Sequence, residues 1–431
     1  MLSLFGTCSV ALLIPAQAAD ASGFYLQEQS VRGWGRANSG EVADQGAASL
    51  WWNPASVGWR GEGEEGALSV SFGATGILPS GRIEDAGTQI DRPVVAAAPV
   101  GGVPVLRDPV QKGVLPATAV AFRLSDRIAL GLAISSPYSF TTDYDPAGWQ
   151  RYSAIRTSLL TLDVQPSVAV AVAPWLSAGA GVNIEFADAS LSNALPNLAP
   201  GSPDGRLLLE GKGWDFGWSA GAQLRPAPGV TFGIAYKSAI EHKIAGHFEV
   251  TGLLGPLAIR NRTDQMEGDF STPWQLIFGG RAALAERVTL NAQIVRFGWS
   301  KFDQINLGPP LNTFIPQGYR NTWSYAFGVD GELSDSLTLR SGIQFDQTPT
   351  QNRDARVPDS NRVNYNVGAT MRAGRKLQFD AAASYTDFKT VAITRDERFY
   401  AGTAAQVDVF TEGRARAQRA IVVSLGGRMA F

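Results

Sequence analysis

Two short motifs in the sequence have the spacing of catalytic or phosphate-binding loops. Gly217-Trp218-Ser219-Ala220-Gly221 fits G-x-S-x-G, the turn that exposes a nucleophilic serine between a strand and a helix in hydrolases. Here the motif lies within an alternating segment, and the only histidines that could act as its base are His242 and His247. We therefore expect no catalytic residues in this chain and no enzyme activity.

The second motif, G-x-G-x-x-G at residues 61–66, carries three glutamates, which would repel a phosphate group. We interpret it as a flexible link. The two histidines are five residues apart, which suits neither one face of a strand nor one face of a helix, so we expect both to be solvated. The one cysteine is Cys8. The sequence thus predicts no metal site and no cofactor.

The composition favours a transmembrane β-barrel. Of 431 residues, 47 are glycine and only 18% are charged. After the first 14 residues, no apolar run approaches the ~20 residues that a membrane-spanning helix needs. The formal net charge of −2 disfavours nucleic acid as a partner. Such a chain fits strands whose side chains alternate between lipid and lumen.

The N-terminus has the pattern of a secretory signal peptide. Residues 2–14 form an apolar run, and Ala16-Gln17-Ala18 is a small-x-small cleavage site. No lysine or arginine precedes the apolar run, which a misassigned start codon would explain. We assign residues 1–18 to a signal peptide.

From residue 67 onward, apolar and polar residues alternate in long segments. In residues 337–346, for example, Leu337, Leu339 and Phe345 share one face, and Thr338 and Asp346 lie on the other. We count fourteen such segments, at residues 67–77, 114–124, 127–136, 154–172, 175–189, 211–224, 229–246, 266–283, 286–302, 319–333, 336–347, 362–373, 375–390 and 415–431.

The connections between these segments alternate between short and long. The short ones are turn-like, such as Ser125-Asp126 and Gly374-Arg375, and the others are several times longer. Short periplasmic turns and long outer loops typify outer-membrane barrels. The sequence therefore predicts an all-β fold, a fourteen-stranded antiparallel transmembrane barrel over residues 63–431.

The last segment places an aromatic residue, Phe431, at the end of its outward face. This arrangement resembles the signal that the barrel assembly machinery of the outer membrane reads. We expect the protein in a Gram-negative outer membrane, and as a monomer, because a closed barrel pairs its own strands.

Several motifs, in order along the chain, resemble the FadL family of outer-membrane transporters of long-chain fatty acids and hydrocarbons. Residues 21–26 (ASGFYL), 33–37 (GWGRA) and Asn53-Pro54-Ala55 are similar to that family's N-terminal hatch. Further similarities lie at Tyr152 with 164–168 (VQPSV), at 175–181 (WLSAGAG), at 299–302 (WSKF), and at 345–349 (FDQTP) followed by 357–362 (VPDSNR).

The resemblance implies that residues 19–62 fold inside the barrel as a hatch, or plug. It also implies a lateral gap in the wall, made by an inward kink of the third strand. Ser136, Pro137 and Tyr138 lie at the matching place, and proline cannot donate a ladder hydrogen bond. The alternative is that the strand simply ends at Ser136.

The resemblance further suggests ligand-binding residues. Phe24 matches an aromatic residue beside the family's internal binding site, and Arg320 matches a basic position that faces a ligand head group. An arginine fork suits a carboxylate. Arg151 and Arg156 are further candidates. The alternative for these arginines is an ordinary lumen or rim position.

We therefore expect passive uptake of hydrophobic molecules, foremost long-chain fatty acids. The ligand would land on apolar outer loops around residues 190–210 and 247–265, pass to a pocket beside Phe24, and leave through the lateral gap into membrane lipid as the plug shifts. Transport of aromatic hydrocarbons by the same mechanism is the alternative. An outer-membrane lipase using Ser219 and an adhesive barrel are alternatives from other classes.

Overall fold

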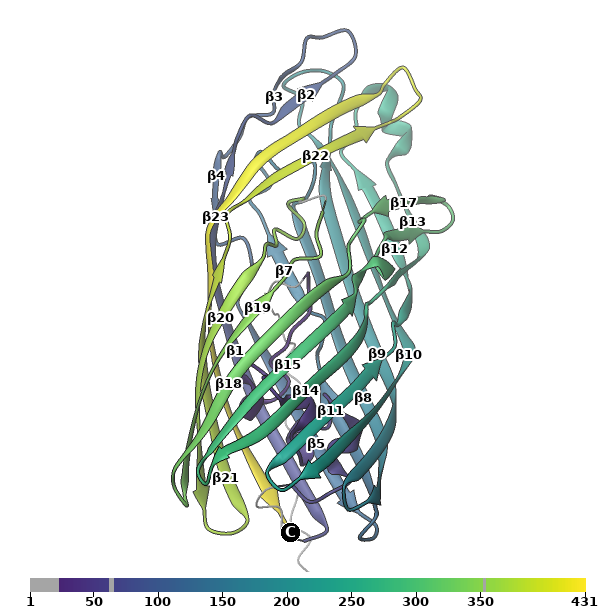
Figure 1. Ribbon diagram of the computed structural model, residues 1–431. Helices are drawn as coiled ribbons and strands as arrows, with labels where there is room; N and C mark the ends of the chain where they lie inside the picture. The colour runs from purple at the N-terminus through teal and green to yellow at the C-terminus, as the bar shows by residue number, and fades with distance from the viewer. Residues whose placement is uncertain (1–22, 62–65, 352–353) are drawn as a thin grey trace, which may run out of the picture.

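The computed structural model describes residues 23–61, 66–351 and 354–431, and it has the form of a closed barrel (Figure 1). The expected signal peptide lies outside the described residues. Fourteen positions around the wall are filled, in chain order, by β1 (Leu68–Asp85), β5 (Gly113–Arg123), β6 (Ile128–Ser135), β8 (Arg156–Ala173), β9 (Leu176–Leu195), β10 (Gly205–Ala227), β11 (Val230–Lys237) with β12 (Glu241–Thr251), β13 (Arg262–Ser271) with β14 (Trp274–Ala285), β15 (Val288–Gly298), β18 (Thr322–Ser334), β19 (Leu337–Asp346), β20 (Arg362–Ala373), β21 (Leu377–Phe388) and β23 (Val407–Ala430).

Each strand pairs with its chain neighbours in antiparallel register, and the ring closes where the first strand meets the last. β1 pairs with β5 on one side and with β23 on the other, from Ser69 opposite Ala430 to Asp85 opposite Gly413. Closure pairs the first strand with the last, which a chain in lipid requires because no water can satisfy its backbone. The predicted fourteen-stranded antiparallel barrel is confirmed.

Two predicted strands are each broken in two. Residues 229–246 form β11 and β12, and residues 266–283 fall in β13 and β14. The second break falls at Thr272–Pro273, where proline removes a ladder donor. At the first break, the Ser238 hydroxyl accepts a hydrogen bond from the Trp218 amide in place of a ladder partner. Because apolar and polar residues continue to alternate across both breaks, the sequence pattern does not reveal them.

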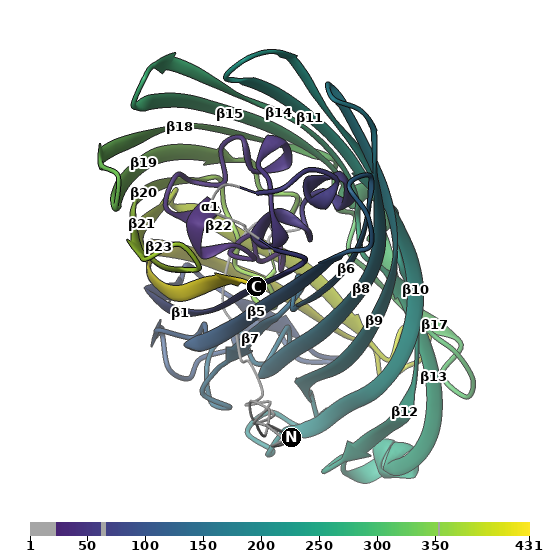
Figure 2. The same cartoon turned by 90° about the horizontal axis from the view of Figure 1, so that it is seen from below.

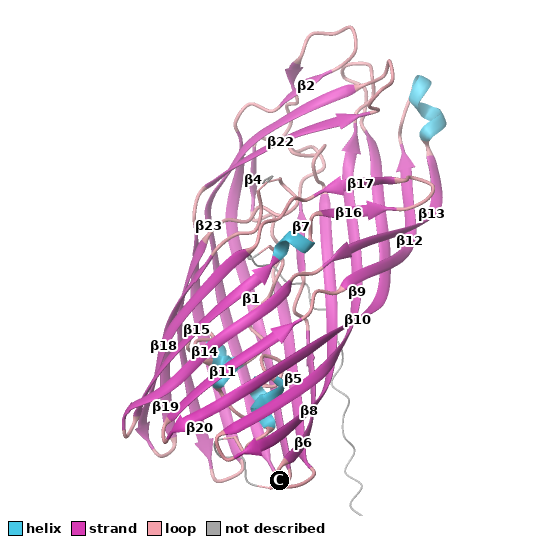
Figure 3. Cartoon of the chain, turned by 45° about the vertical axis from the view of Figure 1, so that its right-hand side comes forward, coloured by secondary structure: helices cyan, strands magenta, loops and turns pink. Residues whose placement is uncertain are grey.

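Several segments that were expected to be loops are also strands. β9 and β10 extend into residues 190–210, and β12 and β13 extend into 247–265, with a helical turn, η4 (Gly255–Arg260), between them (Figure 3). The additional short strands are β2 (Gln89–Asp91), β3 (Ala98–Pro99), β4 (Val105–Arg107), β7 (Phe140–Asp143), β16 (Gln304–Leu307), β17 (Thr313–Pro316) and β22 (Val391–Phe399). Most belong to hairpins at the outer end of the barrel.

The two faces of the wall differ as the alternation predicts. On β20 the outward Tyr365, Val367 and Met371 are exposed, whereas the inward Asn364 and Asn366 are buried. Aromatic and aliphatic side chains therefore cover the outside, and polar ones line much of the lumen. Among the described residues, no helix is both long and apolar enough to cross a membrane.

Residues 23–61, here called the N-terminal segment, lie inside the barrel (Figure 2). The segment contains one short helix, α1 (Val31–Trp34), and three helical turns, η1 (Glu41–Ala43), η2 (Ala47–Ser49) and η3 (Pro54–Val57). Asn53 begins η3, because its side-chain oxygen accepts from the Ala55 amide at 2.9 Å while its amide group donates to the Val42 carbonyl at 2.7 Å. The Asn53-Pro54-Ala55 motif is thus a helix cap that also joins two turns of the segment.

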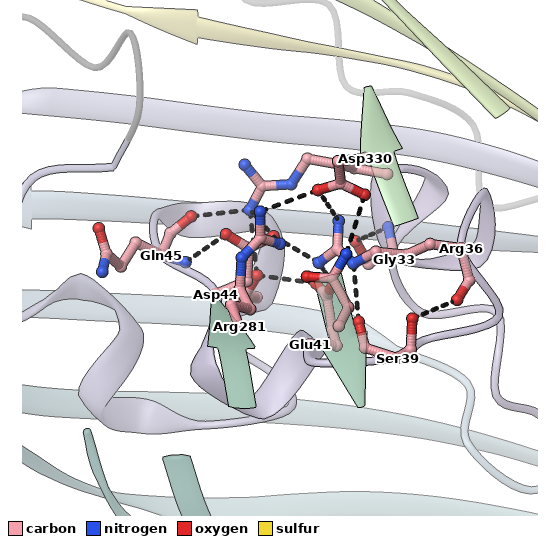
Figure 4. A network of polar contacts seen from close by, with 12 residues as sticks. Gly33, Arg36, Ser39, Glu41, Asp44, Gln45, Arg281 and Asp330 are labelled. Carbon is pink, nitrogen blue, oxygen red and sulfur yellow. Dashed lines mark hydrogen bonds and ion pairs between the residues drawn. The ribbon is translucent and has the colours of Figure 1, made fainter. Parts of the chain in front are cut away.

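Buried ion pairs join the N-terminal segment to the wall (Figure 4). Arg36 contacts Glu41 and Asp44 of the segment, and Arg281 of β14 bridges Asp44 and Asp330 of β18 at 2.9 Å each. Burial by itself raises the pKa of Asp44, but the guanidinium groups around it, Arg281 first, outweigh burial and hold that pKa well below its usual range. Removing one partner would leave a buried charge uncompensated.

Glycines on the inner face allow the segment to touch the wall closely. At ten of them, spread over ten strands, an added Cβ would lie 3.0 Å or less from an atom of the segment; they are Gly73, Gly131, Gly179, Gly221, Gly233, Gly279, Gly328, Gly342, Gly368 and Gly426. At Gly342 the atom that would be struck is the Arg36 carbonyl oxygen, 2.3 Å away. The high glycine content therefore has a structural role at this level of the barrel.

We expect Gly342→Ala to destabilise the seating of the N-terminal segment by about 1–3 kcal/mol, the usual effect of forcing a methyl group into a packed site. Gly331→Ala on β18 is the matched control, because nothing lies within 4 Å of its added Cβ. Thermal unfolding and protease cleavage within residues 23–61 measure the effect. Equal behaviour of the two variants would contradict a packing role for Gly342.

Candidate functional site

An apolar cavity lies in the lumen beside the start of the N-terminal segment. Its empty space, counted together with the open solvent at its mouth, is about 680 Å³. Its apolar lining comprises Phe24, Phe140, Leu159, Ala189, Leu191, Leu209, Ile244, Met266, Phe270, Phe302, Ile305, Leu307 and Val357. Most of these residues occupy inward positions of β8, β9, β10, β12 and β13, where the lumen changes from polar to apolar. Such a cavity suits a hydrophobic small molecule.

Phe24 forms one wall of this cavity and is almost fully buried. Its ring meets Trp299 at 4.9 Å and Phe302 at 5.0 Å edge-on, and it stacks on Phe140 at 5.8 Å between centroids. These rings, with Tyr25 and Tyr138, make a continuous aromatic cluster between the cavity and the N-terminal segment. The cluster contains the sequence-predicted Phe24 at its centre.

The wall is interrupted beside this aromatic cluster. The ladder between β6 and β8 ends at Ser135 opposite Asp163, and pairing with β8 resumes at Phe140 of β7 opposite Leu159. Between these points the chain turns inward to the N-terminal segment: the Pro137 carbonyl accepts from the Leu26 amide at 2.7 Å. Ser136, Pro137 and Tyr138 are therefore brought together at an inward kink.

The kink leaves one side of β5 uncovered. In the described part of the chain, β5 pairs with β6 only from Thr118 to Arg123, so residues 113–117 have β1 as their only strand neighbour. Above them the wall is joined again, because the Gln111 amide donates to the Thr141 carbonyl at 2.8 Å. At the Ala117 end of this opening lies a hollow whose empty space, open solvent included, is about 420 Å³, bounded by Ala117, Ala133 and residues of the N-terminal segment. We call this opening the β5–β6 window.

The three sequence-predicted arginines lie away from the cavity lining. Arg151 forms an ion pair with Asp204 at 2.8 Å and so links two outer segments. Arg156 pairs with Asp143 at 2.9 Å near the surface. Arg320 is exposed, and its Nε donates to a loop carbonyl. Their contact with a ligand stays a prediction.

Sequence reasoning missed the polar side chains that line the cavity, which are Thr157, Ser158, Glu210, Gln317 and Arg356. Arg356 directly precedes the family-like run that begins at Val357, so extending that run by one residue would have included it. Thr157 shares the inward face of β8 with Leu159, which alternation alone places there. Nothing in the sequence shows that a loop arginine folds into an apolar lumen.

The expectation that both histidines are solvated is wrong for His242. Its side chain is buried, with Nε2 3.2 Å from a Glu185 oxygen and its ring 5.1 Å from that of Phe270. It lies on the inward face of β12, a strand whose break from β11 was not foreseen. His247 is partly exposed. Within the described ranges, no group of three or more His, Cys, Asp or Glu residues is placed to hold a metal ion.

The start of the N-terminal segment is held by a buried carboxylate. Asp359, in the loop between β19 and β20, accepts from the Gly23 amide at 2.9 Å and from the Thr348 hydroxyl. Burial raises the pKa of Asp359 to about 6, although Arg362 lowers it in part. This carboxylate therefore links the outer loop to the segment that carries Phe24.

Comparison with known proteins gives matches over nearly the whole chain. Residues 12–431 match the family described as outer membrane protein transport protein (OMPP1/FadL/TodX). Outer membrane protein P1 of Haemophilus influenzae is 25% identical over 433 residues, covering 90% of this chain and 92% of that protein. The long-chain fatty acid transport protein of Escherichia coli strain K12 is 25% identical, covering 89% and 92%.

Solved structures share the fold. A FadL homologue of Pseudomonas aeruginosa superimposes with a TM-score of 0.81 at 24% identity, covering 95% of this chain and all of that one. The toluene transporter TbuX of Ralstonia pickettii gives a TM-score of 0.63 at 17% identity, covering 93% and 98%. At these identities the likeness concerns the fold alone.

The raised pKa of Asp359 predicts a pH dependence of the anchor at Gly23. The folded form holds the proton more tightly than the unfolded form, so this contribution to stability is present at low pH and is lost as pH rises from about 4 to about 6, at most about 3 kcal/mol. Asp359→Asn, which keeps an acceptor without the charge, is expected to remove this dependence. Hydrogen exchange of residues 23–28 at about pH 4 and about pH 7 measures it.

Asp108→Asn is the control for this experiment, because Asp108 also accepts a backbone amide, that of Gly81, but lies at the surface. The role assigned to Asp359 is wrong if its asparagine variant and the parent chain show the same change of protection with pH.

Proposed function

Because the chain belongs to the OMPP1/FadL/TodX family of outer membrane transport proteins, we propose that it carries long-chain fatty acids passively across the Gram-negative outer membrane and catalyses no reaction. The observation that carries this proposal is the apolar cavity beside Phe24, whose ring also contacts Tyr138 at the inward kink of the wall. An acyl chain gains no free energy by entering an open polar pore. Burial against apolar walls gives it about 0.8 kcal/mol for each CH₂ group removed from water.

Entry begins at the outer end, where apolar side chains gather. Leu253 and Leu257 are buried beside Leu195, and a second cluster around Phe248 and Met266 continues inward. Met266 also lines the cavity beside Phe24, so apolar contacts extend from the outer strands to that cavity. A ligand moves inward along these contacts down its own concentration gradient.

Exit proceeds sideways through the β5–β6 window, with residues 23–26 as the moving part. Phe24 lines the cavity, and Leu26 is bound to the kink beside the window through its hydrogen bond to Pro137. The rest of the N-terminal segment is the plug: its buried ion pairs and close contacts with the wall glycines favour local movement over expulsion. The ligand then reaches membrane lipid without crossing the periplasmic end.

Aromatic hydrocarbons are the second candidate substrates. Phe24, Phe140, Phe270 and Phe302 all line the cavity, and aromatic rings pack well against aromatic ligands. The same window would release them. A further proposal concerns assembly: Phe431 directly follows β23, has an exposed ring and suits recognition by the barrel assembly machinery.

Deleting the gene is expected to reduce uptake of radiolabelled oleate by intact cells, and re-expression of the full chain to restore it. Uptake of radiolabelled toluene is measured in the same cells. A defect in oleate uptake supports fatty acid transport, and a defect in toluene uptake alone transfers the mechanism to hydrocarbons. If neither uptake changes, the proposed transport function fails.

Ala117→Trp is expected to lower oleate uptake severalfold, because the indole would fill the β5–β6 window from the inward face of β5. Oleate binding to the purified protein should persist, since Ala117 does not line the cavity beside Phe24. Ala292→Trp, which adds the same ring to the lipid face of β15, is the control. Unimpaired uptake in a folded Ala117→Trp variant would exclude this window as the exit.

A further inference from the structure

The apolar outer surface of the wall ends at a defined level on β1 and β23. On β1 the outward residues from Leu68 to Leu78 are all apolar, and on β23 so are those from Met429 to Ile421. The ten residue steps from Leu68 to Leu78 rise about 25 Å along the barrel axis, at ~3.4 Å per residue and a strand tilt of about 40°. Because the apolar band of such a barrel is about 25 Å tall, the next outward residues lie at the level of the outer lipid head groups.

Arginines occupy that level on three neighbouring strands, β4, β1 and β23 (Figure 1). Arg107 of β4 is paired with Arg82 of β1, and Arg82 is paired with Arg416 of β23, so the three form one row across the sheet. The row points outward, because the residues beside it on the three strands are buried toward the lumen; they are Ile83, Leu106 and Ala415. With two more outward arginines of β23, the row forms what we call the arginine patch: Arg82, Arg107, Arg414, Arg416 and Arg419.

One carboxylate lies within the arginine patch, and it contacts two of the arginines. The Arg82 Nε lies 2.7 Å from a Glu84 oxygen, and the Arg416 Nε lies 3.6 Å from the other. In the described ranges, no carboxylate oxygen comes within 4 Å of Arg107 or Arg414, and both arginines are exposed. Their guanidinium donors are therefore available to a ligand.

Three more acidic residues stand at the edge of the arginine patch. They are Asp108 beyond β4, Asp387 of β21 and Glu412 of β23, and all three are exposed. In the part of the chain that the structure describes, none of them forms an ion pair with an arginine of the patch. Asp108 instead accepts a hydrogen bond from the Gly81 amide at 2.9 Å. The edge carboxylates thus leave the arginine donors unoccupied.

A row of arginines on one face of a sheet is unfavourable by itself. Like charges directly opposite each other on neighbouring strands repel and destabilise the pairing. A phosphate group removes this repulsion, because its oxygens accept bidentate hydrogen bonds from guanidinium groups. A lipid places phosphate at this height, and its acyl chains would cover the apolar residues directly below. A soluble partner would have no use for those apolar residues.

We propose that the arginine patch binds the phosphorylated head group of a lipid in the outer leaflet, a lipopolysaccharide. The phosphates would accept hydrogen bonds from Arg82, Arg107 and Arg414, while the acyl chains lie against Leu78 and Ile421. The inference is independent of which solute the barrel carries. Because the patch spans β4, β1 and β23, the bound lipid would hold the first and last strands of the wall together.

The test titrates the full-length protein, purified in a neutral detergent, with diphosphoryl lipid A and counts bound lipid by native mass spectrometry. Arg107→Gln is expected to weaken binding about 5-fold, and Arg107→Gln combined with Arg82→Gln and Arg414→Gln about 100-fold, since each arginine near a charged lipid surface contributes a similar free energy. Lipid A from which both phosphates are removed should bind the parent and the combined variant alike.

A second combined variant is the matched control. It carries Arg127→Gln, Arg287→Gln and Arg375→Gln, which remove the same charge from exposed positions at the opposite, periplasmic end of the wall. Heat-modifiable gel migration confirms that each variant is a folded barrel. We expect the control to bind diphosphoryl lipid A as the parent does.

Loss of lipid A binding in the patch variant, with binding retained in the control, supports the proposal. Equal binding by all three proteins overturns it, and so does an equal loss in both variants, which would show an effect of overall charge alone. Inorganic phosphate is titrated in parallel. If it binds the parent as tightly as diphosphoryl lipid A does, the patch is a site for free phosphate and the lipid assignment fails.

Discussion

A backbone that crosses lipid must pair every amide and carbonyl group, and the rest of this structure follows from that constraint. The fourteen-membered ring meets it along its ladders but not at the kink after Ser135, where β6 leaves the wall. There the N-terminal segment supplies the missing partners: Leu26 donates to Pro137, and Ser139 donates to Phe24. The opening in the wall and the position of Phe24 at the cavity thus depend on the same hydrogen bonds.

The barrel could be predicted well from the sequence because local residue patterns specify its strands and turns. Alternation identified the wall strands, and short turns such as Ser125-Asp126 fixed their number. The two broken strands were missed because apolar alternation continues across Thr272–Pro273, and proline alone does not distinguish a break from a bulge. The hairpins at the outer end were missed because strands outside lipid need no apolar face.

The candidate site was less predictable because it depends on residues far apart in the sequence. Phe24 and the kink residues entered through a resemblance, and the structure places them side by side. Arg356 carries no local mark of its burial, since only the folded loop places it in the lumen. His242 was misjudged because its inward direction depends on the register of β12, which begins after an unforeseen break. The sequence shows the glycines only as a high glycine content. Their close contact with the N-terminal segment is visible only in the folded structure.

The ring of inward glycines has a consequence for the order in which this protein forms. Contacts as close as that between Gly342 and Arg36 leave no clearance through which a separate folded segment could later slide into a finished barrel. The segment precedes β1 in the chain, and the seam between β1 and β23 joins the first strand to the last. The N-terminal segment and the wall must therefore fold together. The segment is enclosed when the last strand, β23, pairs with β1.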